Sequence, residues 1–181
     1  APNPEVMLFV PYLSDAILIV ETLNTFKAHP KLIWGQDSGF MFSAFYDAVG
    51  NLSNGILTRT IFTPGFAKTK SVAQAVNALF KERYGEDFGG ASARAFTGMQ
   101  ALAMAINAAG STKPEALKEA LNALYVPPEE LVVPFDGIRF NEKGQNILAR
   151  GLIAQWQNGQ LEIIYPFEFA TADMIYPFPG Y

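Results

Sequence analysis

The stretch FVPYLSDAILIV, from Phe9 to Val20, most constrains the fold, because its apolar run is interrupted in the middle. A membrane-spanning helix needs about 20 mostly apolar residues, and Pro11 and Asp15 break this run. The apolar residues from Val6 to Val10 are typical of a strand that is covered on both faces. We therefore expect a strand, a tight loop that holds Tyr12, and then a helix.

The helix is expected to take Ser14 as its N-cap, because the serine hydroxyl can accept a free backbone N–H of the first turn. Asp15 adds negative charge to that turn, where the helix dipole favours it. Apolar residues continue at helical spacing to Phe26. Pro30 cannot continue a helix, so the helix is expected to stop before it.

The next elements keep the same alternation. We expect a strand, a helix and a strand at Lys31–Gly35, Gly39–Val49 and Ile56–Phe62. Strands that alternate with helices predict a parallel α/β unit. Three strands with one or two helices do not complete a doubly wound sheet, so the chain is expected to begin in the middle of a fold.

The second half of the sequence changes in character. Three helices are expected after the breaker Thr63-Pro64-Gly65, at Thr69–Tyr84, Ala91–Ala109 and from Lys113 to about Leu124. The middle one carries almost no charge beyond Arg94, and we expect it to be buried on most sides.

Antiparallel strands are expected near the C-terminus. The pattern changes from Val126, and a strand pair around turns is expected in the stretch VVPFDGIRFNEKGQN, from Val132 to Asn146. Asn158-Gly159 is a strong hairpin signal, and it separates the expected strands Gly151–Gln157 and Leu161–Tyr165. The last 16 residues, from Pro166, are rich in aromatic residues and proline. No element is assigned to them.

Composition excludes several classes of function. The net charge is −4, whereas nucleic-acid binding needs basic surface. The absence of cysteine excludes disulfides, thiol catalysis and cysteine-based metal sites. His29 is the single histidine, so a Ser-His-Asp triad lacks a plausible base. The stretch DGIRFNEKG misses the spacing of a calcium loop. We predict no metal site and no cofactor.

Hydrophobic residues make up 50% of the 181 residues and charged residues only 17%, against a usual charged share of about 25%. Two explanations stay open. Faces of this chain are normally covered by other polypeptide, or a well-buried core is joined by an oligomer interface. Bare apolar faces would make the isolated chain self-associate. The start Ala1-Pro2-Asn3-Pro4 lacks the features of a signal peptide, so the protein is cytosolic or its N-terminus was removed.

Five segments, in order along nearly the whole chain, resemble the type I periplasmic binding proteins of ABC transporters, in the branched-chain amino-acid (Leu/Ile/Val) group. They are Pro4-Glu5-Val6 with Tyr12–Leu18, then Trp34–Phe40, Ala95–Gly110, Phe135–Asn146 and Ala154–Gly159. No single segment is specific. Members of this family are roughly twice as long, so the resemblance implies a C-terminal fragment that lacks the signal peptide and the N-terminal half.

The resemblance also implies an organisation in two lobes. Residues 1–63 would be part of the second lobe, residues 64–125 part of the first, and residues 126–181 the hinge return with a C-terminal hairpin and tail. The fold class implied is α/β, with parallel sheets flanked by helices and an antiparallel hairpin near the C-terminus.

The function implied is that of an extracytoplasmic, periplasmic solute-binding component of an ABC importer. Such a protein is not an enzyme, and it would hold a small amino acid or related carboxylate between two lobes and deliver it to the permease subunits. One alternative is a ligand-sensing regulator or receptor domain of the same fold. A second is a hydrolase on an α/β scaffold.

Ligands of open α/β sheets lie beyond the carboxyl ends of the strands, where this chain places Tyr12, Gln36 with Asp37, and Thr63. The resemblance implies that Asp37 meets the ammonium group of an amino acid, by a charge-assisted hydrogen bond. Asp37 could equally be a turn or N-cap residue of the next helix. Tyr12 lines the cleft or packs at the strand end, and Phe96 forms an apolar wall or belongs to the core. Trp34 is assigned to the core.

Overall fold

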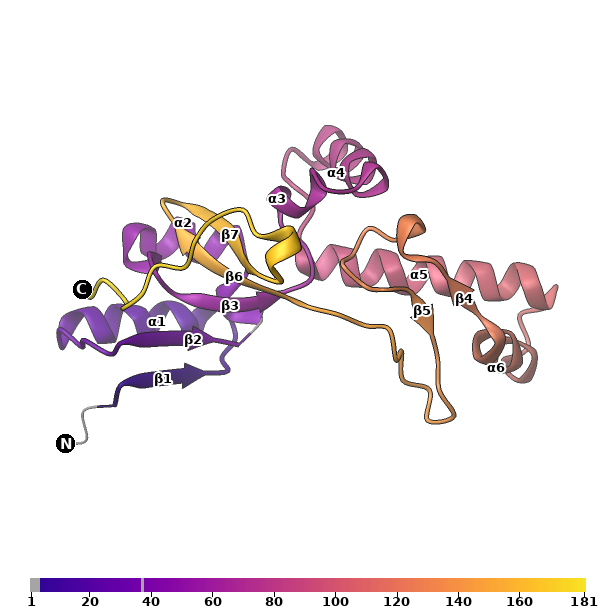
Figure 1. The fold of residues 1–181 in the computed structure, drawn as a ribbon, viewed down its shortest axis with the longest axis horizontal. Helices are drawn as coiled ribbons and strands as arrows, with labels where there is room; N and C mark the ends of the chain where they lie inside the picture. Colours follow the sequence, from indigo (N-terminus) through magenta and orange to yellow (C-terminus); the bar gives the residue numbers. More distant parts are fainter. Residues whose placement is uncertain (1–3, 37) are drawn as a thin grey trace. The chain divides into compact units, whose positions relative to one another are not determined.

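The computed structural model describes residues 4–36 and 38–181. The chain forms two compact units, one made of the residues up to Gly65 together with Leu152–Tyr181, and the other made of Phe66–Gly151 (Figure 1). The lobe boundaries expected near residues 63 and 125 refer to a longer protein and stay a prediction.

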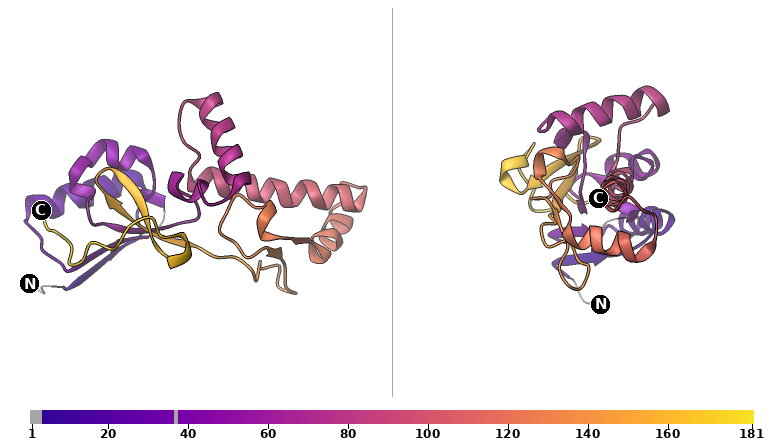
Figure 2. Two further views of the ribbon diagram at one scale, coloured as in Figure 1. Left: turned by 45° about the horizontal axis from the view of Figure 1, so that its top comes forward. Right: turned by 90° about the vertical axis from the view of Figure 1, so that its right-hand side faces the viewer.

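The first unit is built on a mixed sheet. Its strands are β1 (Val6–Phe9), β2 (Leu32–Gly35), β3 (Leu57–Thr60), β6 (Leu152–Gln157) and β7 (Gln160–Tyr165). In the described part of the chain they lie in the order β1-β2-β3-β6-β7 (Figure 2). The first three are parallel, and β6 and β7 are antiparallel to their neighbours. The predicted strand–helix alternation and the predicted hairpin are both confirmed.

Helices α1 (Leu13–Thr25) and α2 (Ser43–Val49) cover one face of this sheet. Ala16 and Val20 of α1 and Phe45 of α2 are buried in one cluster with Ile33 and Trp156 of the strands. The Trp156 indole N–H donates to the Phe40 carbonyl at 2.7 Å, so this large ring is buried with its polar group satisfied. Burying each large apolar side chain contributes about 1.5–3 kcal/mol.

The sequence predicts that β1 is covered on both faces, and the structure corrects this. Met7 and Phe9 are half-buried, but Val6, Leu8 and Val10 are exposed. Side chains alternate across a strand, so the apolar run has one covered face and one bare face. β1 is the terminal strand, and within residues 4–36 and 38–181 helices pack on only one side of it.

Two helix starts also differ from expectation. α1 begins at Leu13, so Ser14 is already helical, and the N-cap is Tyr12, with no side-chain cap. The extended backbone of Tyr12 lets its carbonyl accept the first helical hydrogen bond, from the Ala16 N–H at 2.9 Å. The expected helix from Gly39 is split into a 3₁₀ turn, η1 (Ser38–Phe40), and α2. The split lets the Phe40 ring fold back over Gly35, where a β-carbon would lie 2.2 Å from the ring.

The remaining turns of the first unit are short. The 3₁₀ helices η2 (Gly50–Ser53) and η4 (Phe167–Phe169) precede β3 and follow β7. Asn158 and Gly159, between β6 and β7, have positive φ angles of 50° and 82°, as a two-residue type I′ hairpin turn requires. The unassigned C-terminal residues pack back onto this unit, and Phe178 is buried in its core.

The second unit is mainly helical. It contains α4 (Ser71–Tyr84), α5 (Gly90–Ala109), α6 (Pro114–Ala123), η3 (Pro128–Glu130) and the strand pair β4 (Tyr125–Val126) and β5 (Ile138–Arg139), and the short α3 (Pro64–Ala67) leads into it. The three long helices lie where the sequence predicts them.

Burial of α5 differs from the expectation that it is covered on most sides. Its buried residues form one narrow stripe, Gly90, Ala93, Thr97, Ala101 and Ala105, and Met99 is exposed. The helix is apolar because it is rich in alanine. Alanine gives a helix a low charge without supplying the large side chains that a core on every side would need.

Candidate functional site

The loops that follow β1 and β2 meet at the carboxyl end of the parallel strands. The Gln36 N–H donates to the Phe9 carbonyl at 2.7 Å, and the Gly39 N–H donates to the Pro11 carbonyl at 3.2 Å. A β-carbon on Gly39 would lie 2.7 Å from the Tyr12 carbonyl oxygen. Only glycine fits that approach, so the two loops are held together by backbone contacts, at the edge where open α/β sheets bind ligands.

Tyr12 stands at this edge with its side chain largely free. Its carbonyl starts α1, but 77% of the residue is exposed. Val10, two residues earlier, is exposed as well. The two together present an apolar and aromatic surface beside the loop of Gln36. That Tyr12 lines a ligand cleft stays a prediction.

Asp37 and residues 1–3 lie outside the described residues. The proposed contact of Asp37 with an ammonium group therefore stays a prediction from the resemblance. On either side of it, Gln36 follows β2 and η1 begins at Ser38.

Trp34 and Gln36 form a pair that sequence reasoning did not anticipate. The Trp34 indole N–H donates to the Gln36 side-chain carbonyl at 3.0 Å. An indole can only donate, so the contact fixes the amide with its oxygen towards Trp34 and its NH₂ group directed elsewhere. Trp34 is half-buried, so its assignment to the core is only partly right. The signal was the i, i+2 spacing, which puts both side chains on one face of a strand.

Thr63 follows β3 but does not offer its side chain to solvent. Only 1% of the residue is exposed. The chain turns inward just before it, where the Thr60 hydroxyl donates to the Phe62 carbonyl at 3.1 Å. Thr63 therefore supports the loop from within, whereas Tyr12 and Gln36 reach the surface.

Phe96 lies in the second unit, on α5. It is 39% exposed, and its ring makes an edge-to-face contact with Phe88 at 6.1 Å between centroids. Phe88 is buried and also contacts Phe80, at 5.2 Å. Phe96 thus closes a small aromatic cluster and shows one side to solvent. Its role as a ligand wall stays a prediction.

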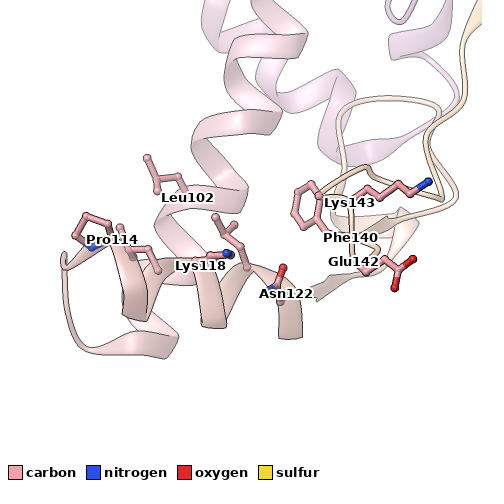
Figure 3. A pocket seen from close by; sticks show the side chains of 10 residues that line it. Leu102, Pro114, Lys118, Asn122, Phe140, Glu142 and Lys143 are labelled. Atoms are coloured by element: carbon pink, nitrogen blue, oxygen red, sulfur yellow. The ribbon is translucent and has the colours of Figure 1, made fainter.

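A separate hollow of about 540 Å³ lies in the second unit between α5, α6 and the turn after β5 (Figure 3). Leu102, Leu117, Leu121 and Phe140 give it apolar walls, and Lys118 and Glu142 lie among its lining residues. None of the site residues predicted from the sequence lines it. The lining therefore combines apolar contact with the charged groups of Lys118, Glu142 and Lys143.

Side chains with shifted pKa values lie elsewhere. Burial lowers the pKa of Lys70, against the opposing charges of Asp136 and Glu129. Its ammonium group donates to the Pro128 and Val133 carbonyls at 2.9 Å, so it pins the segment around η3. Burial raises the pKa of the Tyr181 hydroxyl. The Tyr181 ring packs edge-to-face on Phe178, at 5.1 Å between centroids. Neither Lys70 nor Tyr181 is part of the strand-end loops.

The described residues contain neither a metal-ligand cluster nor a helix that could span a membrane. Among its residues, no three or more His, Cys, Asp or Glu side chains gather as they would to hold a metal ion. None of its helices combines the length and apolar character needed to cross a bilayer.

No protein-family model matches the chain. Among curated proteins, it is 28% identical over 174 residues to the Leu/Ile/Val-binding protein homolog 8 of Brucella abortus, covering 94% of this chain and 43% of the relative. It is 27% identical over 183 residues to homolog 7 of the same species, covering 96% of this chain and 44% of the relative. The chain thus spans less than half the length of these relatives.

Solved structures with the same fold include a leucine binding protein from Thermotoga maritima, with a TM-score of 0.74 and 21% identity over 90% of this chain and 44% of that chain. A putative branched-chain amino acid ABC transporter protein from Silicibacter pomeroyi has a TM-score of 0.71 and 20% identity. The match covers 96% of this chain and 47% of that chain. A solute binding protein from R. palustris, solved in complex with benzoate, has a TM-score of 0.72 and 13% identity. The match covers 89% of this chain and 42% of that chain. These matches confirm the resemblance identified from the sequence and the predicted fold class.

Proposed function

We propose that this chain, which has the type I periplasmic-binding-protein fold and resembles the Leu/Ile/Val-binding proteins, is part of a solute-binding component of an ABC importer. One observation carries the proposal: the loops after β1 and β2 are joined by backbone contacts through Gly39, at the carboxyl end of a parallel sheet. That edge is where such sheets bind small molecules.

The ligand we propose is a small amino acid or related carboxylate. An exposed Tyr12 and Val10 supply apolar and aromatic surface, which suits an aliphatic or aromatic side chain. The NH₂ group of Gln36, turned away from Trp34, is a donor suited to a carboxylate. The carboxylate of Asp37 would pair with the ligand's ammonium group.

The remaining parts of the proposal concern the longer protein that the relatives represent. Two lobes would close over the ligand by hinge motion, with Phe96 as an apolar wall from the first lobe. The protein would work outside the cytoplasm and deliver its ligand to the permease subunits. We propose binding and release without turnover.

Ligand binding can be tested with the 181-residue chain by fluorescence and calorimetry. Its two tryptophans differ, because Trp34 stands beside Gln36 and Trp156 is buried in the core. Leucine, isoleucine, valine and benzoate are expected to change the emission of the wild-type chain. The Trp34→Phe variant, which keeps Trp156, should lose the emission change while calorimetry still detects binding. If none of these compounds gives heat or an emission change at millimolar concentration, the strand-end loops do not bind them without the rest of the longer protein. Absence of binding in that longer protein as well would overturn the proposed function.

In the intact, longer protein, Asp37→Ala should weaken amino-acid binding by at least tenfold, which corresponds to about 1.4 kcal/mol, because it removes the partner of the ligand's ammonium group. Benzoate lacks that group, so its binding should change little. Asp47→Ala is the matched control, since Asp47 is an exposed aspartate of α2. Equal affinities of the intact Asp37→Ala and wild-type proteins for leucine, measured by calorimetry, would remove Asp37 from the site.

A further inference from the structure

Two Asn-Gly pairs occur in the sequence, Asn54-Gly55 and Asn158-Gly159. An asparagine before glycine can cyclise, because the glycine backbone nitrogen reaches the side-chain carbonyl carbon of the asparagine and no β-carbon on the glycine hinders the approach. The nitrogen must first lose its proton to solvent base, so a glycine N–H held in a buried hydrogen bond reacts only after that bond opens. The two pairs share this local chemistry, and the structure places their glycine N–H groups in different surroundings.

The Gly55 N–H is bonded and covered. It donates to the Trp156 carbonyl at 2.8 Å, and Gly55 is buried. A β-carbon on Gly55 would lie 3.0 Å from the Phe178 ring, so the C-terminal tail packs directly on this glycine. The Asn54 side-chain carbonyl accepts from the Asn158 N–H at 3.2 Å, and this bond restricts rotation of the side chain that would have to react.

The turn between β6 and β7 leaves the second pair without such bonds. The ladder of the hairpin ends at the pair Gln157 and Gln160, so both turn residues lie outside it. Asn158 is exposed. Gly159 is half-buried, because its α-carbon packs on Tyr46, 2.8 Å from where a β-carbon would lie. Among the described residues, the Gly159 N–H and the Asn158 side-chain amide have no hydrogen-bond partner.

We propose that Asn158 is a site of spontaneous deamidation in the folded chain and that Asn54 is protected. The deprotonated Gly159 nitrogen attacks the side-chain carbonyl carbon of Asn158, and a C–N bond forms. The proton taken from Gly159 returns through solvent to the leaving NH₂ group, which departs as ammonia. Water then opens the cyclic imide at either carbonyl and gives aspartate or isoaspartate, with one added negative charge. The reaction is independent of the proposed ligand.

Isoaspartate changes the backbone of the turn as well as its charge. The main chain of isoaspartate runs through the former side-chain methylene, so the turn gains one backbone carbon. A two-residue turn accepts few backbone conformations, and here it sets the register of Gln157 with Gln160. The lengthened turn cannot keep both that register and the packing of Gly159 on Tyr46. Tyr46 stacks on Trp156 at 5.6 Å between centroids, so we expect the hairpin to loosen at this end.

Mass spectrometry of the 181-residue chain tests the site. Peptide maps taken during incubation measure the replacement of NH₂ by OH at each asparagine, and enzymatic methylation identifies isoaspartate. Asn158 should react at least tenfold faster than Asn54, which corresponds to about 1.4 kcal/mol for opening the bonds around Gly55. The rate at Asn158 should rise with pH, because the attacking nitrogen must be deprotonated.

The same chain unfolded in urea is the control for the local sequence. Both pairs are Asn-Gly, so they should react at similar rates once the tertiary contacts are lost. Hydrogen exchange gives an independent measurement in the folded chain. The Gly159 amide should exchange fast and the Gly55 amide slowly, because only the second must open a bond to Trp156.

Asn158→Gly is the matched variant for the effect on the hairpin. Gly-Gly also suits a type I′ turn, and the variant has no side-chain amide at this position. After incubation, the wild-type chain should unfold at a lower urea concentration than before, whereas the Asn158→Gly chain should be unchanged. Equal losses of stability in both chains would overturn the expected effect on the hairpin.

Three results would overturn the site itself. The first is an Asn54 that reacts as fast as Asn158 in the folded chain. The second is an Asn158 that reacts in urea but stays intact in the folded chain. The third is a Gly159 amide as well protected from hydrogen exchange as the Gly55 amide.

Discussion

The two edges of the sheet in the first unit differ in whether the chain covers them. At β7, Thr171 and Ala172 donate backbone N–H groups to the Ile163 carbonyl, and the Thr171 hydroxyl bonds to both Ile163 and Glu162. On the outer side of β1, away from β2, Val6 and Leu8 have neither a neighbouring strand nor a tail within residues 4–36 and 38–181. The C-terminal tail therefore covers the edge at β7, and no described residue covers the outer side of β1.

The C-terminal tail covers the edge of β7, and residues beyond Thr171 anchor this tail to the first unit. The buried Gln155 accepts from the Ile175 N–H at 2.8 Å and donates to the Ile175 carbonyl at 3.0 Å. Phe178 then enters the core, and its N–H donates to the Lys31 carbonyl at 2.8 Å. The tail covers the edge because aromatic burial holds it in place. An edge without such an anchor stays open even when its side chains are as apolar as those of β1.

The largest effect is expected at the anchor of the tail. Phe178→Ala should destabilise the chain by about 3–5 kcal/mol, because it leaves a cavity in a closely packed core. Loosening the tail would also expose β7 and make the two edges alike, so self-association should increase. Urea unfolding measures the first effect and sedimentation the second.

Phe167→Ala is the control for this prediction, because Phe167 belongs to the same tail but is exposed. It should change the free energy of unfolding by no more than about 0.5 kcal/mol. Equal losses at both positions would show that Phe178 does not anchor the tail.

A smaller effect is expected at Gln155. Gln155→Leu keeps the volume but leaves the buried Gly55 carbonyl and both Ile175 backbone groups without this partner. Unsatisfied buried groups cost about 1–3 kcal/mol, and amide exchange at Ile175 should become faster. Gln160→Leu, at an exposed position of β7, should leave stability and exchange nearly unchanged. If the Ile175 amide of the Gln155→Leu chain stays fully protected from hydrogen exchange, the Gln155 side chain does not anchor the tail.

The smallest effect is expected at the protected edge itself. Thr171→Val removes the hydroxyl that bonds to Ile163 and Glu162 but keeps the backbone bond to Ile163. The expected loss is about 0.5–1.5 kcal/mol, with faster amide exchange at Ile163. Thr112→Val, in the exposed loop before α6, is the matched control. If the two variants behave alike, the hydroxyl adds nothing to the cover of β7.

The candidate site was predictable in part. Sequence reasoning found the strand ends and named Tyr12 and Gln36, because strands and glycine-containing turns leave local signals. It did not find the Trp34–Gln36 hydrogen bond, and it did not distinguish the exposed Tyr12 from the buried Thr63. The hydrogen bond and the difference in exposure both depend on how the loops after different strands pack on one another.

The sequence by itself determined the order of elements, the parallel start of the sheet and the hairpin at Asn158-Gly159, because periodicity and turn chemistry act over a few neighbouring residues. It also left open whether apolar faces are normally covered by other polypeptide or form an oligomer interface. Which faces these are was decided by the tertiary structure alone. The tail returns to cover β7 and nothing described covers β1, and such long-range contacts depend on partners far along the chain that no local pattern specifies.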